Sequence, residues 1–192
     1  MGLLIVGLVF FLGMHSVRIV ADDWRTAQIA KSGERRWKLV FTAISLIGFV
    51  LIVFGYAQAR QATLPLYTPP VWMRHVAALL TLLAFILVAA AYVKGTRIKA
   101  RVGHPMILGV KVWAFAHLLA NGTLADVVLF GAFLAWAVLD YIASRRRDRA
   151  AGTVYPAGPP SRDLIAIGAG GLAWAIFGFV LHGPLIGVRP FA

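Results

Sequence analysis

Apolar residues occur along this chain in long blocks that are separated by short polar segments. A helix needs about 20 largely apolar residues to cross the hydrocarbon of a bilayer. Five blocks meet this requirement, at residues 37–57, 72–93, 105–120 with its flanks, 123–143 and 164–181. The pattern therefore predicts membrane-spanning helices.

A shorter apolar block occupies residues 2–14. It has the length of a signal-peptide core, but no positive charge precedes it and no small-residue cleavage pattern follows before Asp22. We expect it to be retained, as a helix that spans only by carrying His15, Ser16 and Arg18 into or near the hydrocarbon. Such polar groups must face protein, a ligand or water.

Lysine and arginine are concentrated in alternate connections between the predicted helices. They lie in the first, third and fifth connections, at Arg25, Lys31, Arg35, Arg36, Lys38, Lys94, Arg97, Lys99, Arg101, Arg145, Arg146, Arg147, Arg149 and Arg162. The second connection holds only Arg60, and the fourth holds none. By the positive-inside rule the odd connections are cytoplasmic. The predicted fold is an all-α, polytopic membrane bundle of about six transmembrane helices, one domain over residues 1–192, with both termini on the non-cytoplasmic side.

The composition supports this fold class and excludes several others. The chain is 60% hydrophobic and 14% charged, with 19 Lys and Arg against 7 Asp and Glu. Topology accounts for the net charge of +12, so the expected partner is the lipid bilayer and not nucleic acid, and the Arg145–149 run is mainly a topology signal. The absence of cysteine excludes disulfides and thiolate ligands.

Five histidines are the main candidates for chemistry. In this topology His15 and His104 lie toward the cytoplasm, and His75, His117 and His182 toward the far side. The spacings contain neither the His-Glu-x-x-His zinc motif nor a carboxylate cluster, which argues against a metal held by protein ligands alone.

Residues 105–120 carry a stripe of functional candidates. Gly109, Trp113, His117 and Asn121 recur every four residues, which predicts one inward-facing stripe, and Lys111 lies on another face seven residues after His104. Pro105 suits a first helical turn that His104 would open. Two interpretations of His117 stay open: a ligand, or a neutral imidazole bonded to a neighbouring helix. For His104 we favour a structural or anion-contacting role.

Other polar residues have simpler interpretations. His15, Arg18 and Asp22 share a face, which suits an anionic ligand or a cofactor carboxylate; alternatively, Arg18 extends to the headgroups and His15 bonds a carbonyl. Thr123 and Asp126 predict a helix-capping pair. Asp140 is expected to pair with Arg145 or Arg146.

Several motifs together resemble the NnrU family of bacterial membrane proteins. They are His15-Ser16-Val17-Arg18, Trp24-Arg25, Gly33-Glu34-Arg35, His104-Pro105-Met106, the run from Ala116 to Gly122, and Phe133-Ala135-Trp136. The resemblance covers nearly the whole chain. It implies a multi-pass protein of the bacterial inner membrane that is associated with nitrite and nitric oxide reduction.

The same motifs are similar to those of plant zeta-carotene isomerases, which are regarded as haem b proteins with two histidine ligands. The resemblance implies haem b here, with His15 and His117 as axial ligands of the iron. Depth fits this pairing, because His15 and His117 would lie about 5 Å to either side of mid-membrane and could hold the ring from below and above. Pairings of His15 with His104, or of His117 with His75, stay open. Ala114 stands where the isomerases have a cysteine, so a thiolate ligand switch does not carry over.

Other residues complete the expected cofactor site. Arg18 or Lys111 would meet the haem propionates, and His104, Trp113 and Asn121 are further candidates for cofactor contact. His104, Pro105 and Gly109 also match a His-Pro-x-x-x-Gly pattern of membrane methyltransferases that use S-adenosylmethionine. The acidic pair of those enzymes is not reproduced in residues 139–151, which disfavours methyl transfer.

The sequence thus leads to a ranked set of functions. The first is a haem b redox or sensing component of denitrification, acting on nitric oxide or a small lipid-soluble substrate, with isomerisation of a lipid or carotenoid alkene as its enzymatic variant. The alternative is a non-enzymatic transporter or assembly factor, and the third is a membrane methyltransferase. Protein partners and enzymatic status stay open.

Overall fold

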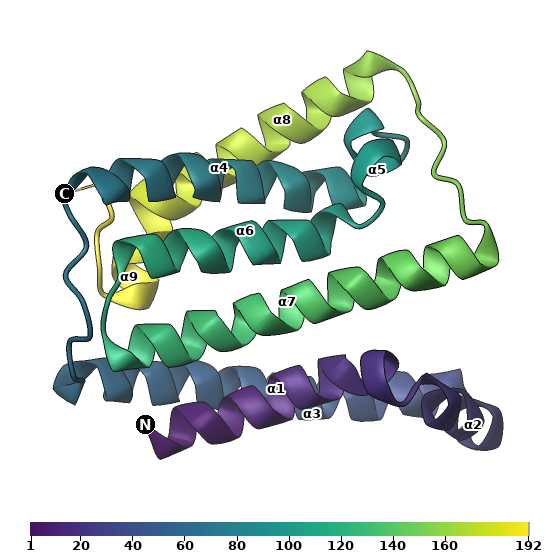
Figure 1. Ribbon diagram of the computed structural model, residues 1–192, viewed down its shortest axis with the longest axis horizontal. Helices are drawn as coiled ribbons and strands as arrows, with labels where there is room; N and C mark the ends of the chain where they lie inside the picture. Colours follow the sequence, from purple (N-terminus) through teal and green to yellow (C-terminus); the bar gives the residue numbers. More distant parts are fainter. Residues whose placement is uncertain (192) are drawn as a thin grey trace.

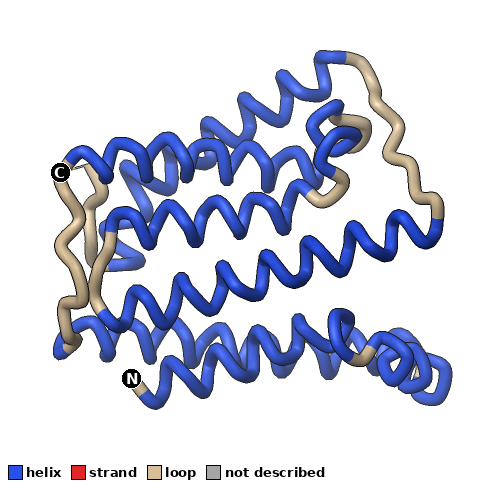
Figure 2. Tube along the Cα trace, viewed as in Figure 1, coloured by secondary structure: helices blue, strands red, loops and turns tan. Residues whose placement is uncertain are grey.

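A computed structural model describes residues 1–191, which excludes only Ala192, the last residue of the predicted domain. Most of these residues are helical, and none of them forms a strand (Figure 2). The helices are α1 Gly2–Val20, α2 Asp22–Ser32, α3 Glu34–Ala59, the short η1 Arg60–Ala62, α4 Trp72–Tyr92, α5 Arg97–Val102, α6 Pro105–Ala120, α7 Leu124–Ala151, α8 Pro160–Ala175, the π-helical η2 Ile176–Leu181 and α9 His182–Ile186.

The apolar helices lie side by side in the order α3, α1, α7, α6, α4 and α8 (Figure 1). Helices α1, α3, α4, α7 and α8 with its continuation are long and apolar enough to cross a membrane. Helix α6 is apolar but has only 16 residues, about 24 Å at 1.5 Å per residue. The predicted all-α membrane bundle is therefore confirmed, and α7 lies between α1 and α6, which carry His15 and His117.

The connections gather at two ends of the bundle. Helices α2 and α5 and the α7–α8 linker lie at one end, whereas both termini and residues 60–71 lie at the other (Figure 1). We call the first the basic end, because it carries the three basic connections. These connections are more ordered than expected: α2 and α5 are helices, and the Arg145–149 run forms the last turns of α7. Helix α7 ends at Gly152, whose φ of +60° favours glycine.

Helices α1 and α3 pack closely along a stripe of small residues. The buried positions of α3 recur every three or four residues, at Ser45, Gly48, Ile52, Gly55 and Ala59. A Cβ at Gly48 would lie 2.6 Å from the Phe11 backbone nitrogen, and one at Gly7 would lie 2.6 Å from that of Ile52. Because lipid drives helices together only weakly, close backbone approach at small residues supplies the packing energy.

Only some of the glycines of α8 allow a close contact with a neighbouring helix. A Cβ at Gly170 would lie 2.6 Å from the Ile86 Cα, so this residue packs against α4. Gly168 and Gly171 have no atom within 4 Å of such a Cβ. Close packing of α8 on α4 is therefore confined to the face of α8 that carries Gly170.

Substitution of Gly48 by alanine tests the α1–α3 contact. Gly48→Ala should lower the melting temperature of the detergent-solubilised protein, followed by tryptophan fluorescence, because the methyl group overpacks a backbone contact at a cost of about 1–3 kcal/mol. Gly131→Ala is the matched control, since nothing lies within 4 Å of a Cβ there. Equal melting temperatures for the two variants would contradict the packing.

Single cysteines can test the orientation, because the chain has none of its own. Ala157 lies in the α7–α8 linker and Gln61 in η1 at the opposite end, and both are exposed. In intact cells a membrane-impermeant maleimide should label Gln61→Cys, and it should label Ala157→Cys only after permeabilisation. The reverse pattern would invert the topology.

Candidate functional site

His15 lies inside a cluster of aromatic rings near the basic end of α1. Its Nδ1 lies 2.7 Å from the Phe11 carbonyl oxygen, one turn earlier. Because a carbonyl only accepts, Nδ1 carries the proton and the lone pair is on Nε2. The imidazole stacks on Phe11, with centroids 4.3 Å apart at 26°, and it meets the edges of Phe41 and Trp136.

His117 on α6 repeats this arrangement. Its Nδ1 donates to the Trp113 carbonyl at 2.8 Å, again one turn earlier. Its ring stacks on Phe130 of α7, with centroids 4.5 Å apart at 26°, and lies 5.0 Å from the Trp113 ring. Both imidazoles therefore keep Nε2 free of the backbone.

One face of α7 contacts both histidine clusters. We call Phe130, Phe133 and Trp136 the aromatic face of α7; their spacing of three residues places them on one side of the helix. Phe133 lies 5.8 Å from Phe11 of α1 and 5.6 Å from Trp113 of α6. A continuous chain of rings thus connects His15 with His117.

The two imidazoles lie at different depths. His117 meets Phe130 and His15 meets Trp136, and these positions on α7 are about 9 Å apart along its axis. This offset agrees with the depth difference expected from the sequence. The rings of Phe11, Phe133 and Trp113 lie between them, so the structure brings both histidines to one helix face without direct contact.

The two cations expected at cofactor carboxylates have other partners. The Arg18 side chain is 59% exposed, and its Nε lies 3.9 Å from Asp22. Lys111 extends over the Tyr141 ring, with Nζ 5.2 Å from the centroid. Arg18 therefore extends outward, as its simpler interpretation anticipated.

The stripe expected on α6 divides between two neighbours. Trp113 and His117 face α7, but a Cβ at Gly109 would lie 3.0 Å from the Ala84 carbonyl oxygen of α4. These three positions of the stripe all face neighbouring helices, but they meet two different ones, because positions four apart drift about 40° per step around a helix. Asn121 ends α6, and its side-chain amide donates to the His117 carbonyl at 2.9 Å.

The loop between η1 and α4 makes hydrogen bonds to the C-terminal end of α6. Tyr67 donates its hydroxyl to the carbonyls of Leu118 and Asn121. The Gly122 carbonyl accepts from the backbone nitrogens of Leu66 and Tyr67, at 2.8 and 3.1 Å. Because the Tyr67 carbonyl fills the place of a Gly122 side chain, a glycine at this position has a structural explanation.

His104 belongs to a separate polar cluster at the basic end. It caps the entrance of α6, where Pro105 occupies the first turn as expected. Its Nε2 lies 2.9 Å from Asp148 Oδ2, and Asp148 Oδ1 accepts from the Tyr155 hydroxyl at 3.0 Å. Burial first, and then the bond to Asp148, raise the pKa of Tyr155, so it stays a neutral donor. These bonds give His104 the structural role that we favoured.

For Asp126 and Asp140, two acidic residues of α7, the spacing in the sequence predicts the first partner correctly and the second one wrongly. Thr123 and Asp126 form a reciprocal capping box, as predicted. Asp126 also accepts from Tyr56 of α3 at 2.6 Å. Asp140, however, pairs with Arg147 at 3.8 Å and not with Arg145 or Arg146, because Arg145 is bonded to Asp148.

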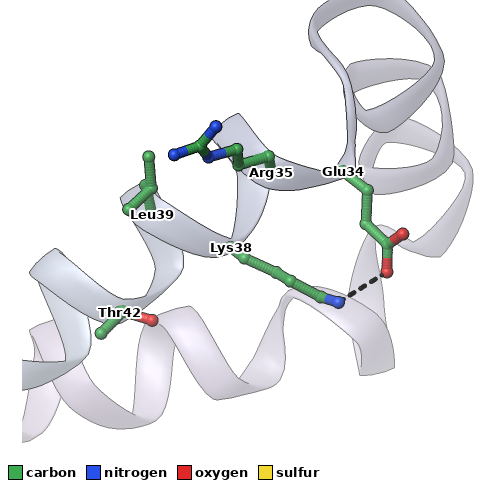
Figure 3. A pocket seen from close by; sticks show the side chains of 5 residues that line it. All are labelled: Glu34, Arg35, Lys38, Leu39 and Thr42. Atoms are coloured by element: carbon green, nitrogen blue, oxygen red, sulfur yellow. Dashed lines mark ion pairs between the residues drawn. The ribbon is translucent and has the colours of Figure 1, made fainter.

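Two hollows lie away from the histidine clusters. One, of about 390 Å³, is lined by residues beside His104, including Lys99 and Tyr155. The other, also about 390 Å³, lies on the first turns of α3, where Lys38 pairs with Glu34 at 2.9 Å and Arg35 points away (Figure 3). Both residues of that ion pair are well exposed, so this hollow is a solvated surface.

The aromatic face of α7 was not predicted as a functional feature from the sequence. Phe133 and Trp136 were noted there only as members of a motif that resembles a family. The three-residue spacing with Phe130 could have revealed a shared face, but not its contacts with two other helices. Nothing in the sequence marked Ser45, a buried residue of α3, as a functional candidate either.

Comparison with known proteins gives one match. Residues 3–190 match the family described as NnrU protein. No curated protein and no solved structure matches the chain.

Removal of the Asp126 carboxylate tests the link between α3 and α7. Asp126→Ala should destabilise the protein by about 1–3 kcal/mol, because it leaves Tyr56 and the start of α7 without their acceptor. Thermal unfolding followed by tryptophan fluorescence measures the loss. The control is Asp23→Ala on the exposed side of α2, and the same melting temperature in both variants would refute the link.

Proposed function

Because this chain belongs to the NnrU family of membrane proteins, we propose that it is a haem b protein of the bacterial inner membrane, with His15 and His117 as the axial ligands, and that it acts in redox chemistry or sensing linked to nitrite and nitric oxide. Family membership supports the nitrogen-oxide context. The haem and its two ligands follow from the resemblance to the zeta-carotene isomerases, and the surroundings of His15 and His117 in this chain support them.

One observation carries the proposal: both imidazoles are prepared to bind a metal in the same way. The Phe11 and Trp113 carbonyls each hold a protonated Nδ1, which fixes the ring and leaves the basic Nε2 for iron. A hydrogen bond from the ring nitrogen that faces away from the metal is the usual arrangement for metal-bound histidine. No cluster of three or more metal-binding side chains occurs in residues 1–191, whereas haem requires only two axial ligands.

The surroundings of the two histidines fit a flat, apolar group. Phe11, Phe133 and Trp113 lie in contact with one another between the imidazoles, so these rings would have to move apart to become the walls of a haem site. Bound haem supplies one-electron chemistry and affinity for nitric oxide. The chain itself orients two imidazoles and surrounds them with aromatic side chains that exclude water.

Other residues would tune the site without coordinating the iron. Asn121 and Tyr67 fix the end of α6, so they position the His117 backbone. Trp113 contributes both its carbonyl and its ring. Arg18 and Lys111 would reach cofactor carboxylates only by leaving Asp22 and Tyr141.

Absorption spectroscopy tests the proposal. The full chain is expressed in haem-replete cells, purified in detergent and measured oxidised and then reduced. We expect a Soret band in the wild type, and its loss or a large decrease in His15→Ala and in His117→Ala. His75→Ala is the matched control, because this histidine is exposed at the start of α4, and its spectrum should be unchanged.

Two results would contradict the proposal: a wild-type protein without a Soret band, or an unchanged spectrum in both ligand variants. A wild-type protein without a Soret band would favour the alternative function, a non-enzymatic transporter or assembly factor. Product analysis with carotenoid or lipid alkenes would show whether a haem-loaded protein is also an isomerase. Binding of S-adenosylmethionine near His104 would instead support the methyltransferase.

A further inference from the structure

Two buried polar atoms in the described residues have no hydrogen-bond partner: Ser45 Oγ on α3 and Trp136 Nε1 on α7. Ser45 is 8% exposed. A buried donor without a partner loses its bonds to water and gains nothing in return, so such atoms are rare in folded proteins. Each calls for an explanation.

Comparable residues elsewhere in this chain are satisfied. The hydroxyls of Ser16 and Ser32 donate to the carbonyls four residues earlier, Leu12 and Gln28, at 2.6 and 2.7 Å. That local bond is the usual solution for serine in a helix. Trp174 Nε1 donates to Thr81 at 3.0 Å. Ser45 and Trp136 therefore differ from these three residues, whose polar atoms are bonded within the protein.

Trp136 lies directly beside His15. The indole meets the imidazole edge to face, with centroids 6.0 Å apart and planes at 90°. The indole N–H makes no direct bond to the imidazole. A donor thus lies beside the His15 ring with nothing from the protein to accept its proton.

Ser45 lies on α3, which also contacts the His15 ring, through Phe41. On that helix Gly48 contacts Phe11 and Phe41 contacts the His15 ring. Ser45 lies between Phe41 and Gly48 on the buried stripe that faces α1. This register places Ser45 at the depth between Phe11 and His15, so the two unpartnered donors lie at similar depth on the two helices that contact the His15 ring.

We propose that Ser45 and Trp136 form, beside His15, a binding site for an oxygen atom of a small neutral molecule, which accepts one hydrogen bond from each of them. The rings of Phe11 and Phe41 make the surroundings apolar, so a charged ligand would pay a large desolvation cost. Water and a lipid-soluble carbonyl compound share the required acceptor oxygen. The site needs no haem, because its two donors are separate from the proposed iron ligands.

Spectra of the indole N–H groups test this site. In the full chain labelled with indole-¹⁵N tryptophan, each of the six tryptophans can give one proton–nitrogen correlation, and Trp136→Phe identifies the Trp136 signal by its loss. We expect this signal at a hydrogen-bonded, downfield position. Ser45→Ala should shift it, whereas Ser16→Ala should not, because the Ser16 hydroxyl is already bonded to its own helix.

The source of the oxygen is distinguished in the same spectra. Cross-relaxation of the Trp136 N–H with water, without added ligand, identifies water. A saturable shift on addition of duroquinone, a small neutral carbonyl probe, identifies a lipid-soluble carbonyl compound. A Trp136 signal at an unbonded position that neither Ser45→Ala nor duroquinone moves would overturn the proposal.

Stability gives an independent measure. An occupied site should make Ser45→Ala lower the melting temperature, because a hydrogen bond is lost. An empty site should leave it unchanged or raise it, because an unsatisfied hydroxyl is removed, and that result would count against the proposal. The absorption spectrum of the same samples reports on haem separately, so failure of this site and failure of the haem proposal are distinguishable.

Discussion

Lipid offers no hydrogen bonds, and this constraint decides how the polar residues of the chain are placed. Each polar group that enters the bundle must find its partner in protein or in a bound molecule, because an unsatisfied group in hydrocarbon is costly. His15, Ser16 and His117 meet the constraint with the carbonyl one turn earlier. Asp126 meets it with Thr123 and Tyr56. For the histidines this solution has a chemical consequence, because it leaves one basic nitrogen on each.

Helix α7 turns these local solutions into a site. It lies between α1 and α6 (Figure 1), and its aromatic face reaches the rings of both neighbours. The close contact of α1 with α3 fixes the depth of His15, whereas the 60–71 loop and Asn121 fix that of His117. The distance between the histidines thus depends on packing at both ends of the bundle. The binding of any ligand between them would depend on the packing at both ends as well.

The sequence predicted the helices well and the contacts between them less well. Block length and charge identified the spans, and the Thr123–Asp126 cap and Pro105 start were confirmed because they depend on neighbours in sequence. The partner of Asp140 was predicted wrongly because several arginines compete for it, and the contact of Gly109 with α4 was missed because it depends on helix rotation. The shared orientation of His15 and His117 toward α7 could not be read from either helix alone, since it arises from long-range packing.

The central claim is that one face of α7 joins the two histidine clusters. Paired cysteines in this naturally cysteine-free chain test it most directly. With a short membrane-permeant thiol cross-linker, Phe133→Cys should join Phe11→Cys of α1 and, in a second double variant, Trp113→Cys of α6. It should not join Phe115→Cys, which lies on α6 but is 47% exposed. Cross-linking to Phe115→Cys alone, or to neither Phe11→Cys nor Trp113→Cys, would contradict the account.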